Sequence, residues 1–143
     1  MKKYIILLVT AIIIACIAVY VRFQFKVNKS MVNFENNPYT SVLNKELSSA
    51  ELATLINKAM NKNEDNKVVR DENGYFIEND ENSIKIDVQF IIEDTVLTGE
   101  QIERSNETEF ITAYNSAKFK CTKIEYHKKT KLAKHLYFEE LKD

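Results

Sequence analysis

The apolar stretch YIILLVTAIIIACIAVYV, residues 4–21, decides the architecture of this chain. It contains no charged residue, no proline and no glycine, and as an α-helix it would be about 27 Å long. The hydrocarbon core of a bilayer is roughly 30 Å thick and is spanned by about 20 apolar residues. A helix satisfies its own backbone hydrogen bonds, as that core demands. The stretch therefore predicts a single-pass membrane anchor, residues 1–21, that contacts the lipid bilayer through residues 4–21.

The residues at both ends of the stretch fit the two surfaces of a membrane. Tyr4 and Tyr20 stand near its ends, where amphipathic rings prefer the headgroup level. Lys2 and Lys3 precede the stretch and Arg22 follows it, so positive charge alone does not decide the orientation. A short tail with paired lysines nevertheless resembles a signal-anchor. We therefore expect a cell-membrane protein whose C-terminal domain is extracytoplasmic.

Two other interpretations of the N-terminus stay open. The sequence IIAC, residues 13–16, has the apolar, apolar, small, cysteine order of a lipobox, which would make Cys16 the lipidation site of a lipoprotein. The five apolar residues after Cys16 argue against this, because a mature lipoprotein usually continues into a polar tether. The second interpretation is a cleaved signal peptide, although no A-x-A-type site followed by a polar start is present.

Beyond the anchor, the pattern predicts a helical stalk. Pro38 disfavours helical backbone in the residue before it, so we expect the helix to end near Glu35. We assign residues 22–44 to a juxtamembrane stalk or linker and residues 45–143 to one small domain, since roughly 120 residues suffice for one modest core. The apolar side chains of the stalk recur at spacings of four, four and three residues, which places them on one helix face: Phe23, Val27, Met31 and Phe34.

Local patterns in residues 45–143 predict an α+β domain with an antiparallel sheet and about two helices. Ser48 and Glu51 have the spacing of a capping box, which starts a helix over residues 49–62. Residues 83–92, SIKIDVQFII, alternate as in a half-buried strand. Asn73-Gly74 predicts a two-residue hairpin turn within residues 68–80. A second helical stretch starts at Gly99, and the polar residues 105–108 are where it would break in two.

Residues 118–139 predict a terminal β-hairpin, whose register we derive from cross-strand pairing. A turn that places Lys128 opposite Lys131 also places Cys121 opposite Phe138. The same register pairs Lys120 with Glu139, and Glu125 with Lys134. Cys121 would then be buried among apolar groups, with a raised pKa and low reactivity. The predicted core face consists of Phe119, Cys121, Leu132, Leu136 and Phe138.

No set of residues in the sequence has the spacing of a catalytic, cofactor or metal site. Cys121 and His127 lie six residues apart on one predicted strand, about 20 Å, and His135 would point to the other face, which opposes a Cys–His nucleophile. The acidic segment that starts at Asp71 fails the calcium-loop pattern, because Phe76 stands where glycine is required. HExxH, CxxC and a glycine-rich phosphate loop are also absent. We therefore expect no catalytic residue, no cofactor and no metal.

Charge is segregated along the chain although the net charge is only −1. Residues 64–109 carry 14 acidic and 4 basic side chains, whereas residues 110–143 carry 8 lysines and 4 acidic side chains. The near-neutral total gives no support for a nucleic-acid partner. The segregation is typical of solvated faces that attract each other within one small domain. An acidic surface for a cation or a basic partner is the alternative.

Three strings in the sequence resemble a family of short, membrane-anchored bacterial proteins that has no assigned activity. They are TLINKA at residues 54–59, DENGY at residues 71–75 and FKCTKIEYH at residues 119–127. The resemblance covers residues 48–140. It implies an architecture and no catalytic residue.

These observations lead to three functional hypotheses. The first is a non-enzymatic domain that binds another protein of the bacterial cell envelope. The second is a pilin-like or pseudopilin-like subunit, because a membrane helix that continues into a stalk beneath a small α+β domain looks like a type IV pilin. Such subunits usually have a Glu five residues into the mature chain, and residues 4–21 contain none. The third and weakest is an enzyme that uses Cys121 and nearby acids.

Overall fold

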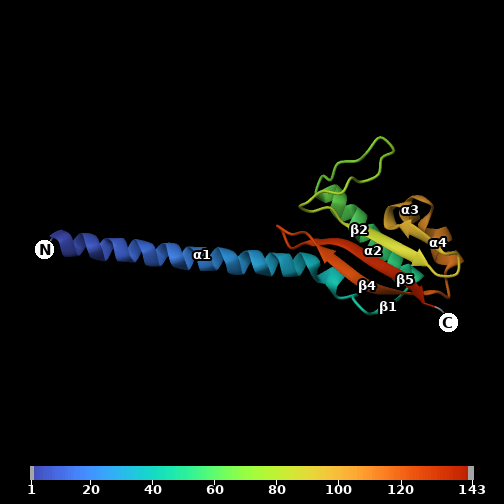
Figure 1. The fold of residues 1–143 in the computed structure, drawn as a ribbon, viewed down its shortest axis with the longest axis horizontal. Helices are drawn as coiled ribbons and strands as arrows, with labels where there is room; N and C mark the ends of the chain where they lie inside the picture. The colour runs from blue at the N-terminus through green and yellow to red at the C-terminus, as the bar shows by residue number, and fades with distance from the viewer. Residues whose placement is uncertain (1, 142–143) are drawn as a thin grey trace. The chain divides into compact units, whose positions relative to one another are not determined.

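A single α-helix, α1 (Lys2–Thr40), contains the whole apolar stretch (Figure 1). The computed structural model describes residues 2–141, and the chain divides into two units that meet between Glu35 and Asn36. In the first unit, an 18-residue window of α1 has a mean hydropathy of 2.9, and none of the window is buried. By length and composition, α1 is therefore able to cross a membrane.

The second unit begins within the last turn of α1, which corrects the expectation that the helix ends before Pro38. The helix continues through Pro38 to Thr40, and Tyr39 is only 3% exposed within the hydrophobic core. Burial of an aromatic side chain contributes about 1.5–3 kcal/mol, which outweighs the local preference against helix before a proline. Residues 36–44, which the sequence placed in the stalk or linker, therefore belong to this second unit.

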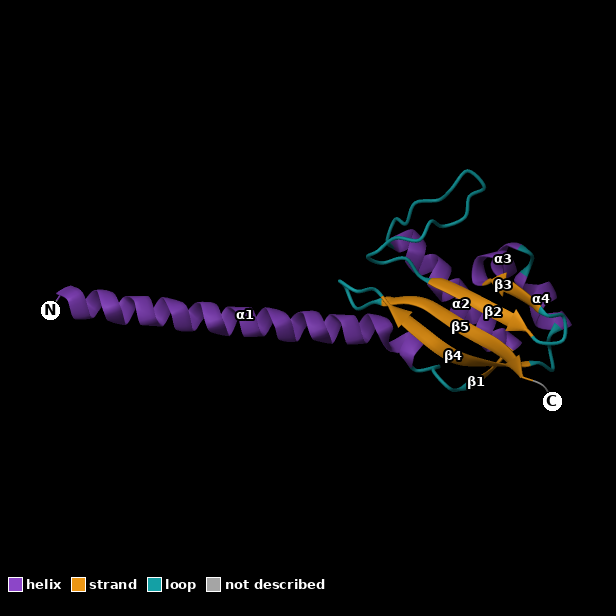
Figure 2. Cartoon of the chain, in the orientation of Figure 1, coloured by secondary structure: helices purple, strands orange, loops and turns teal. Residues whose placement is uncertain are grey.

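The second unit is an α+β domain built on a five-stranded sheet, which confirms the predicted class (Figure 2). Neighbouring strands are antiparallel except for one parallel pair in the middle of the sheet. The two short strands at the edges have no counterpart in the sequence-based prediction. The order across the sheet is β1 (Glu46–Ser48), β4 (Lys118–Tyr126), β5 (Ala133–Leu141), β2 (Lys85–Phe90) and β3 (Thr95–Thr98).

The sheet is mixed, because β2 and β5 form a parallel pair that the predicted antiparallel sheet does not include. After β3 the chain passes through two helices and enters β4, which lies two places from β2. After the β4–β5 turn, β5 occupies the place between β4 and β2. It pairs in parallel with β2, with Ile86 opposite Leu136 and Val88 opposite Phe138. This contact joins residues about 50 positions apart, so no local pattern indicates it.

Three helices pack with the sheet. α2 (Ser49–Asp65) contacts β1, β2 and β4, and it begins with the predicted capping box between Ser48 and Glu51. The second predicted helical stretch breaks into α3 (Gly99–Arg104) and α4 (Glu107–Ala113). α3 contacts β2 and β3, and α4 packs on α2 and α3. The alternation predicted within residues 83–92 is confirmed from Ile84 to Phe90, because the four inward side chains are buried: Ile84, just before β2, and Ile86, Val88 and Phe90 within it.

The terminal hairpin has the predicted turn and most of the predicted register. Cys121 lies opposite Phe138 and Lys120 opposite Glu139, as expected. The pairing of Glu125 with Lys134 is wrong: the register shifts between Cys121 and Lys123, so Glu125 lies opposite His135. A second shift after Glu125 restores the original register at Tyr126 and Ala133. Four residues of the predicted core face are buried: Phe119, Cys121, Leu136 and Phe138. The fifth, Leu132, is only half-buried, and its neighbour Ala133 is buried instead.

Candidate functional site

The α2–β2 loop, residues 66–84, is the longest segment of the domain outside helices and strands. Loops of this length are usually either functional or disordered. Here the end of α2 holds the end of the loop: the Asn63 amide donates to the Ile84 carbonyl at 2.8 Å and accepts from the Ile84 N–H at 2.7 Å. Asn66 donates to the Asn82 carbonyl at 2.8 Å. The loop is therefore pinned where it leaves α2 and where it enters β2.

The middle of the loop is a tight turn that differs from the predicted two-residue hairpin. The Asp71 carboxylate accepts from the N–H groups of Asn73 at 2.9 Å and Tyr75 at 2.8 Å, and the Asp71 carbonyl accepts from Gly74 at 2.9 Å. Gly74 has a φ of 82°, whereas Asn73 is not left-handed. One residue rather than two therefore requires the left-handed region, which is typical of a three-residue hairpin loop with glycine at its end. The predicted flanking strands reduce to a single bridge between Arg70 and Phe76.

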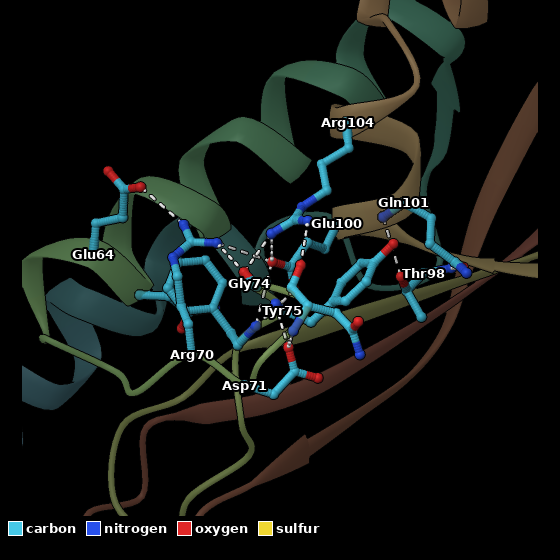
Figure 3. A network of polar contacts seen from close by, with 12 residues as sticks. Glu64, Arg70, Asp71, Gly74, Tyr75, Thr98, Glu100, Gln101 and Arg104 are labelled. Carbon is cyan, nitrogen blue, oxygen red and sulfur yellow. Dashed lines mark hydrogen bonds and ion pairs between the residues drawn. The ribbon is translucent and has the colours of Figure 1, made fainter.

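Glu100, near the start of α3, binds this turn from outside the loop (Figure 3). The Glu100 residue is 9% exposed, and its carboxylate accepts from the Phe76 N–H at 3.0 Å. It also lies 3.2 Å from an Arg70 guanidinium nitrogen and 3.5 Å from one of Arg104. A carboxylate shielded from water is stable only when it is paired and hydrogen-bonded. The loop therefore supplies groups that stabilise the shielded Glu100 carboxylate, and Glu100 in turn holds the loop.

The two arginines hold the turn through ring faces and backbone carbonyls. The Arg70 guanidinium lies 3.7 Å from the centroid of the Phe76 ring, and that of Arg104 lies 4.2 Å from the Tyr75 ring. Both arginines also donate to the Gly74 carbonyl. Planar guanidinium groups combine stacking with several directed hydrogen bonds, which lysine does not reproduce. We call Arg70, Glu100 and Arg104 the arginine clamp.

A pocket of about 280 Å³ lies beside the clamp, between α2, the loop, β2 and the start of α3. Its apolar lining includes Met60, Phe76 and Ile84, and its polar lining includes Glu78 and Gln101. The volume lies just below the range of about 300–1,000 Å³ for small-molecule sites. Among the described residues, no side-chain nitrogen or oxygen that lines this pocket is buried without a hydrogen bond. The pocket therefore gives no indication of which ligand it would hold.

The residues considered for chemistry in the sequence are not brought together. Cys121 is fully buried opposite Phe138, as predicted, and burial raises the pKa of its thiol to about 11. The buried His127 ring donates from Nε2 to the Ser83 carbonyl at 2.8 Å, while its Nδ1 has no hydrogen-bond partner. Cys16 lies on the exposed surface of α1. Within residues 2–141, no group of three or more His, Cys, Asp or Glu is arranged to hold a metal ion.

A polar cluster lies on the face of the sheet away from the core, where the sequence placed His135, but its contact with Asp87 has no counterpart in the sequence-based prediction. His135 stacks on Tyr137 with ring centroids 4.0 Å apart, and its Nε2 lies 2.9 Å from an Asp87 carboxylate oxygen. Burial alone would raise the pKa of Asp87, but the hydrogen bond and charge of His135, together with Lys85, hold that pKa below its ordinary value. The cluster depends on the parallel pairing of β2 with β5, so local sequence patterns give no signal for it.

Comparison with known proteins adds no functional assignment to this geometry. No family model, curated protein or solved structure matches the chain. The resemblance carried by the TLINKA, DENGY and FKCTKIEYH strings therefore stays an expectation.

Proposed function

We propose that this chain is a single-pass protein of the bacterial cell membrane whose extracytoplasmic domain binds another envelope protein without catalysing a reaction. The observation that carries the proposal is α1, whose most apolar window has a mean hydropathy of 2.9 and no buried side chain. A helix of that composition in water would expose a large apolar surface, which soluble monomers avoid. A bilayer removes that surface from water.

The α2–β2 loop is the surface we propose for the partner. Val69 and Ile77 lie side by side across the loop, joined by a 2.8 Å hydrogen bond from the Ile77 N–H to the Val69 carbonyl. Their side chains are 68% and 49% exposed. Ordering one residue costs roughly 1–2 kcal/mol, and the arginine clamp offsets part of that cost. A surface loop held in one conformation by a rigid scaffold is a common position for binding residues.

The chemistry of the loop indicates what such a partner would present. The apolar pair is surrounded along the loop by acidic residues, including Glu72, Asp80 and Glu81. Lys67 and Arg70 are the only basic residues of the loop, and Arg70 is engaged by Glu64 and Glu100. The matching surface is therefore an apolar side chain flanked by lysine or arginine.

Site-specific photocrosslinking in intact cells tests this proposal. A photoreactive amino acid is placed at residue 69, at residue 77, or at Thr112, an exposed control position on α4. We expect the same adduct at residues 69 and 77 and no such adduct at residue 112. Val69→Asp should lower the yield at residue 77 severalfold. Equal yields at all three positions, or none at the loop, would remove the loop as the binding surface.

The pilin-like alternative has one observation in its favour. α1 is continuous over 39 residues, and its last turn is buried in the domain through Asn36 and Tyr39. A gene neighbourhood with a prepilin peptidase and an assembly ATPase would favour this alternative. The intact mass of the mature protein separates it from the others, because the anchored protein keeps its N-terminus, a processed pilin loses a leader, and a lipoprotein would begin at a lipidated Cys16.

A further inference from the structure

We propose that Asn73 is a site of spontaneous covalent modification, in which its side chain cyclises onto the backbone nitrogen of Gly74, and that the arginine clamp controls the rate of this reaction. Asparagine is one of the chemically labile residues of proteins. Asn73 is exposed, and within the part of the chain that the structure describes both of its hydrogen bonds are made by backbone atoms. No hydrogen bond therefore holds its side-chain amide away from the reaction.

The reaction needs only the chain itself and water. The Gly74 nitrogen gives up its proton and attacks the side-chain carbonyl carbon of Asn73, so that a C–N bond forms and the amide nitrogen leaves as ammonia. Glycine favours this step, because it has no side chain to obstruct the approach and its backbone is the least restricted. Water then opens the cyclic imide at either of its C–N bonds, which gives aspartate or isoaspartate. Both products add a negative charge to the proposed binding loop, and the reaction itself requires no partner.

The folded turn holds the peptide group between Asn73 and Gly74 on both sides (Figure 3). The Gly74 N–H donates to the Asp71 carbonyl at 2.9 Å, and the Asn73 carbonyl accepts from Arg104 at 3.1 Å. The Gly74 carbonyl accepts from Arg70 at 2.7 Å and also from Arg104. Reacting atoms must come within about 3–3.5 Å of each other in the right orientation, and the Gly74 nitrogen must first release the proton that it donates to Asp71. The reaction therefore proceeds from an opened turn.

Arg104 acts on this reaction in two opposing ways. Its charge on the Asn73 carbonyl would stabilise the anion that forms when Gly74 loses its proton, because that carbonyl shares the negative charge. Its hydrogen bonds also fix the turn, together with the Glu100 carboxylate that both arginines face. An opened turn no longer fixes Arg104 on the Asn73 carbonyl, so the stabilising charge is lost at the moment when it would act. Protection therefore outweighs activation, and the rate follows the opened fraction of the turn.

Peptide mapping of the full chain in detergent tests this inference. The protein is kept at neutral pH, and mass spectrometry follows the conversion of Asn73 to aspartate and isoaspartate over time. The same chain denatured in guanidinium chloride gives the rate without the fold. We expect Asn73 in the folded wild type to convert about tenfold or more slowly than in the denatured chain, because the closed turn protects it.

Two variants release the clamp, and two controls leave it in place. In Glu100→Gln and in Arg104→Gln, conversion of the asparagine should accelerate roughly fivefold or more, since each variant removes one charge of the clamp. Glu103→Gln, at an exposed position of α3, should convert at the wild-type rate. Cys121→Ala, which weakens the core in β4, should also keep the wild-type rate, because the opening is local to the turn.

Each other result would contradict a different part of the inference. No conversion in the denatured chain would remove Asn73 as a modification site, and equal rates in the folded and denatured chains would show that the turn does not protect it. Equal rates in Glu100→Gln and Glu103→Gln would remove the clamp as the control of the reaction. Slower conversion in Arg104→Gln would show that Arg104 activates the reaction instead of preventing it. Acceleration in Cys121→Ala would show that the reaction follows unfolding of the whole domain.

Discussion

The Glu100 carboxylate accepts a hydrogen bond from the Phe76 N–H at 3.0 Å, across 24 positions of sequence. Phe76 lies in the α2–β2 loop and Glu100 near the start of α3, so this contact joins the loop to the helical layer. Arg70 and Arg104 place their positive charges on the same carboxylate. The order of the turn in the proposed binding loop therefore depends in part on a carboxylate that lies outside the loop.

Glu100→Gln should destabilise the domain by about 1–2 kcal/mol. The amide keeps an acceptor for the Phe76 N–H but removes the charge that both arginines face, and the partial exposure of the arginines moderates the loss. Denaturant unfolding measures the difference, and hydrogen exchange of the Phe76 amide should accelerate more than exchange in β5. Glu103→Gln, at an exposed position of the same helix, is the control. Equal stability of the two variants would show that the clamp does not hold the loop.

Tyr39→Ala should destabilise the domain by about 2–4 kcal/mol, because it removes a buried aromatic ring from the core. Met31→Ala, at an exposed position of the same helix, should change the free energy of unfolding by less than about 0.5 kcal/mol. Denaturation of both variants of the full chain in detergent measures the contrast. Equal effects would place the start of the domain after Tyr39, as the sequence-based prediction had it.

Cys121 should be unreactive in the folded protein at neutral pH. Its thiol is fully buried, and a pKa of about 11 leaves it protonated. A maleimide reagent should label Cys121 only after denaturation, and Cys121→Ala should lower the stability by about 1 kcal/mol. Rapid labelling in the folded state would falsify the burial and reopen the hypothesis of a nucleophilic cysteine.

Asp87 should make the stability of the domain sensitive to acid. Its pKa is lowered in the folded state, so its contribution is complete above the ordinary carboxyl pKa of about 3.9. That contribution is lost as the pH falls through the lower pKa of the folded state. Between pH 5 and pH 2, the wild type should therefore lose more stability than Asp87→Asn. The control Asp94→Asn, at an exposed position, should show the same pH dependence of stability as the wild type. An identical pH dependence for all three proteins would contradict the Asp87–His135 interaction.

Local signals predicted the elements whose residues are neighbours in sequence. The Ser48 and Glu51 side chains cap α2 without help from the rest of the fold, and the alternation from Ile84 to Phe90 requires only one buried face. The break between α3 and α4 at Asn106 follows from the polar residues around it. These features are determined within a few residues, so a pattern is sufficient to find them.

Contacts between distant segments were not predictable in the same way. The parallel pairing of β2 with β5 brings His135 to Asp87, and neither strand alone indicates it. The shift after Cys121 moves Glu125 from Lys134 to His135, because one extra residue in a strand changes the pairs that follow until a second shift restores the register. The sequence also offered no reason to select Glu100 as a residue that holds the α2–β2 loop. Thr98 and Gln101 form a capping box that marks the start of α3, but nothing nearby shows that the α2–β2 loop returns to it.

Labelling of a cysteine at position 116 in intact cells tests the central claim most directly. Ser116 is exposed after α4, and Ser116→Cys is introduced together with Cys16→Ala, while the buried Cys121 stays in place. Membranes are washed in alkaline carbonate after treatment of the cells with a membrane-impermeant maleimide. The account predicts that the protein stays in the membrane pellet and is labelled before lysis. Release into the supernatant, or labelling only after lysis, would contradict a membrane-anchored protein with an extracytoplasmic domain.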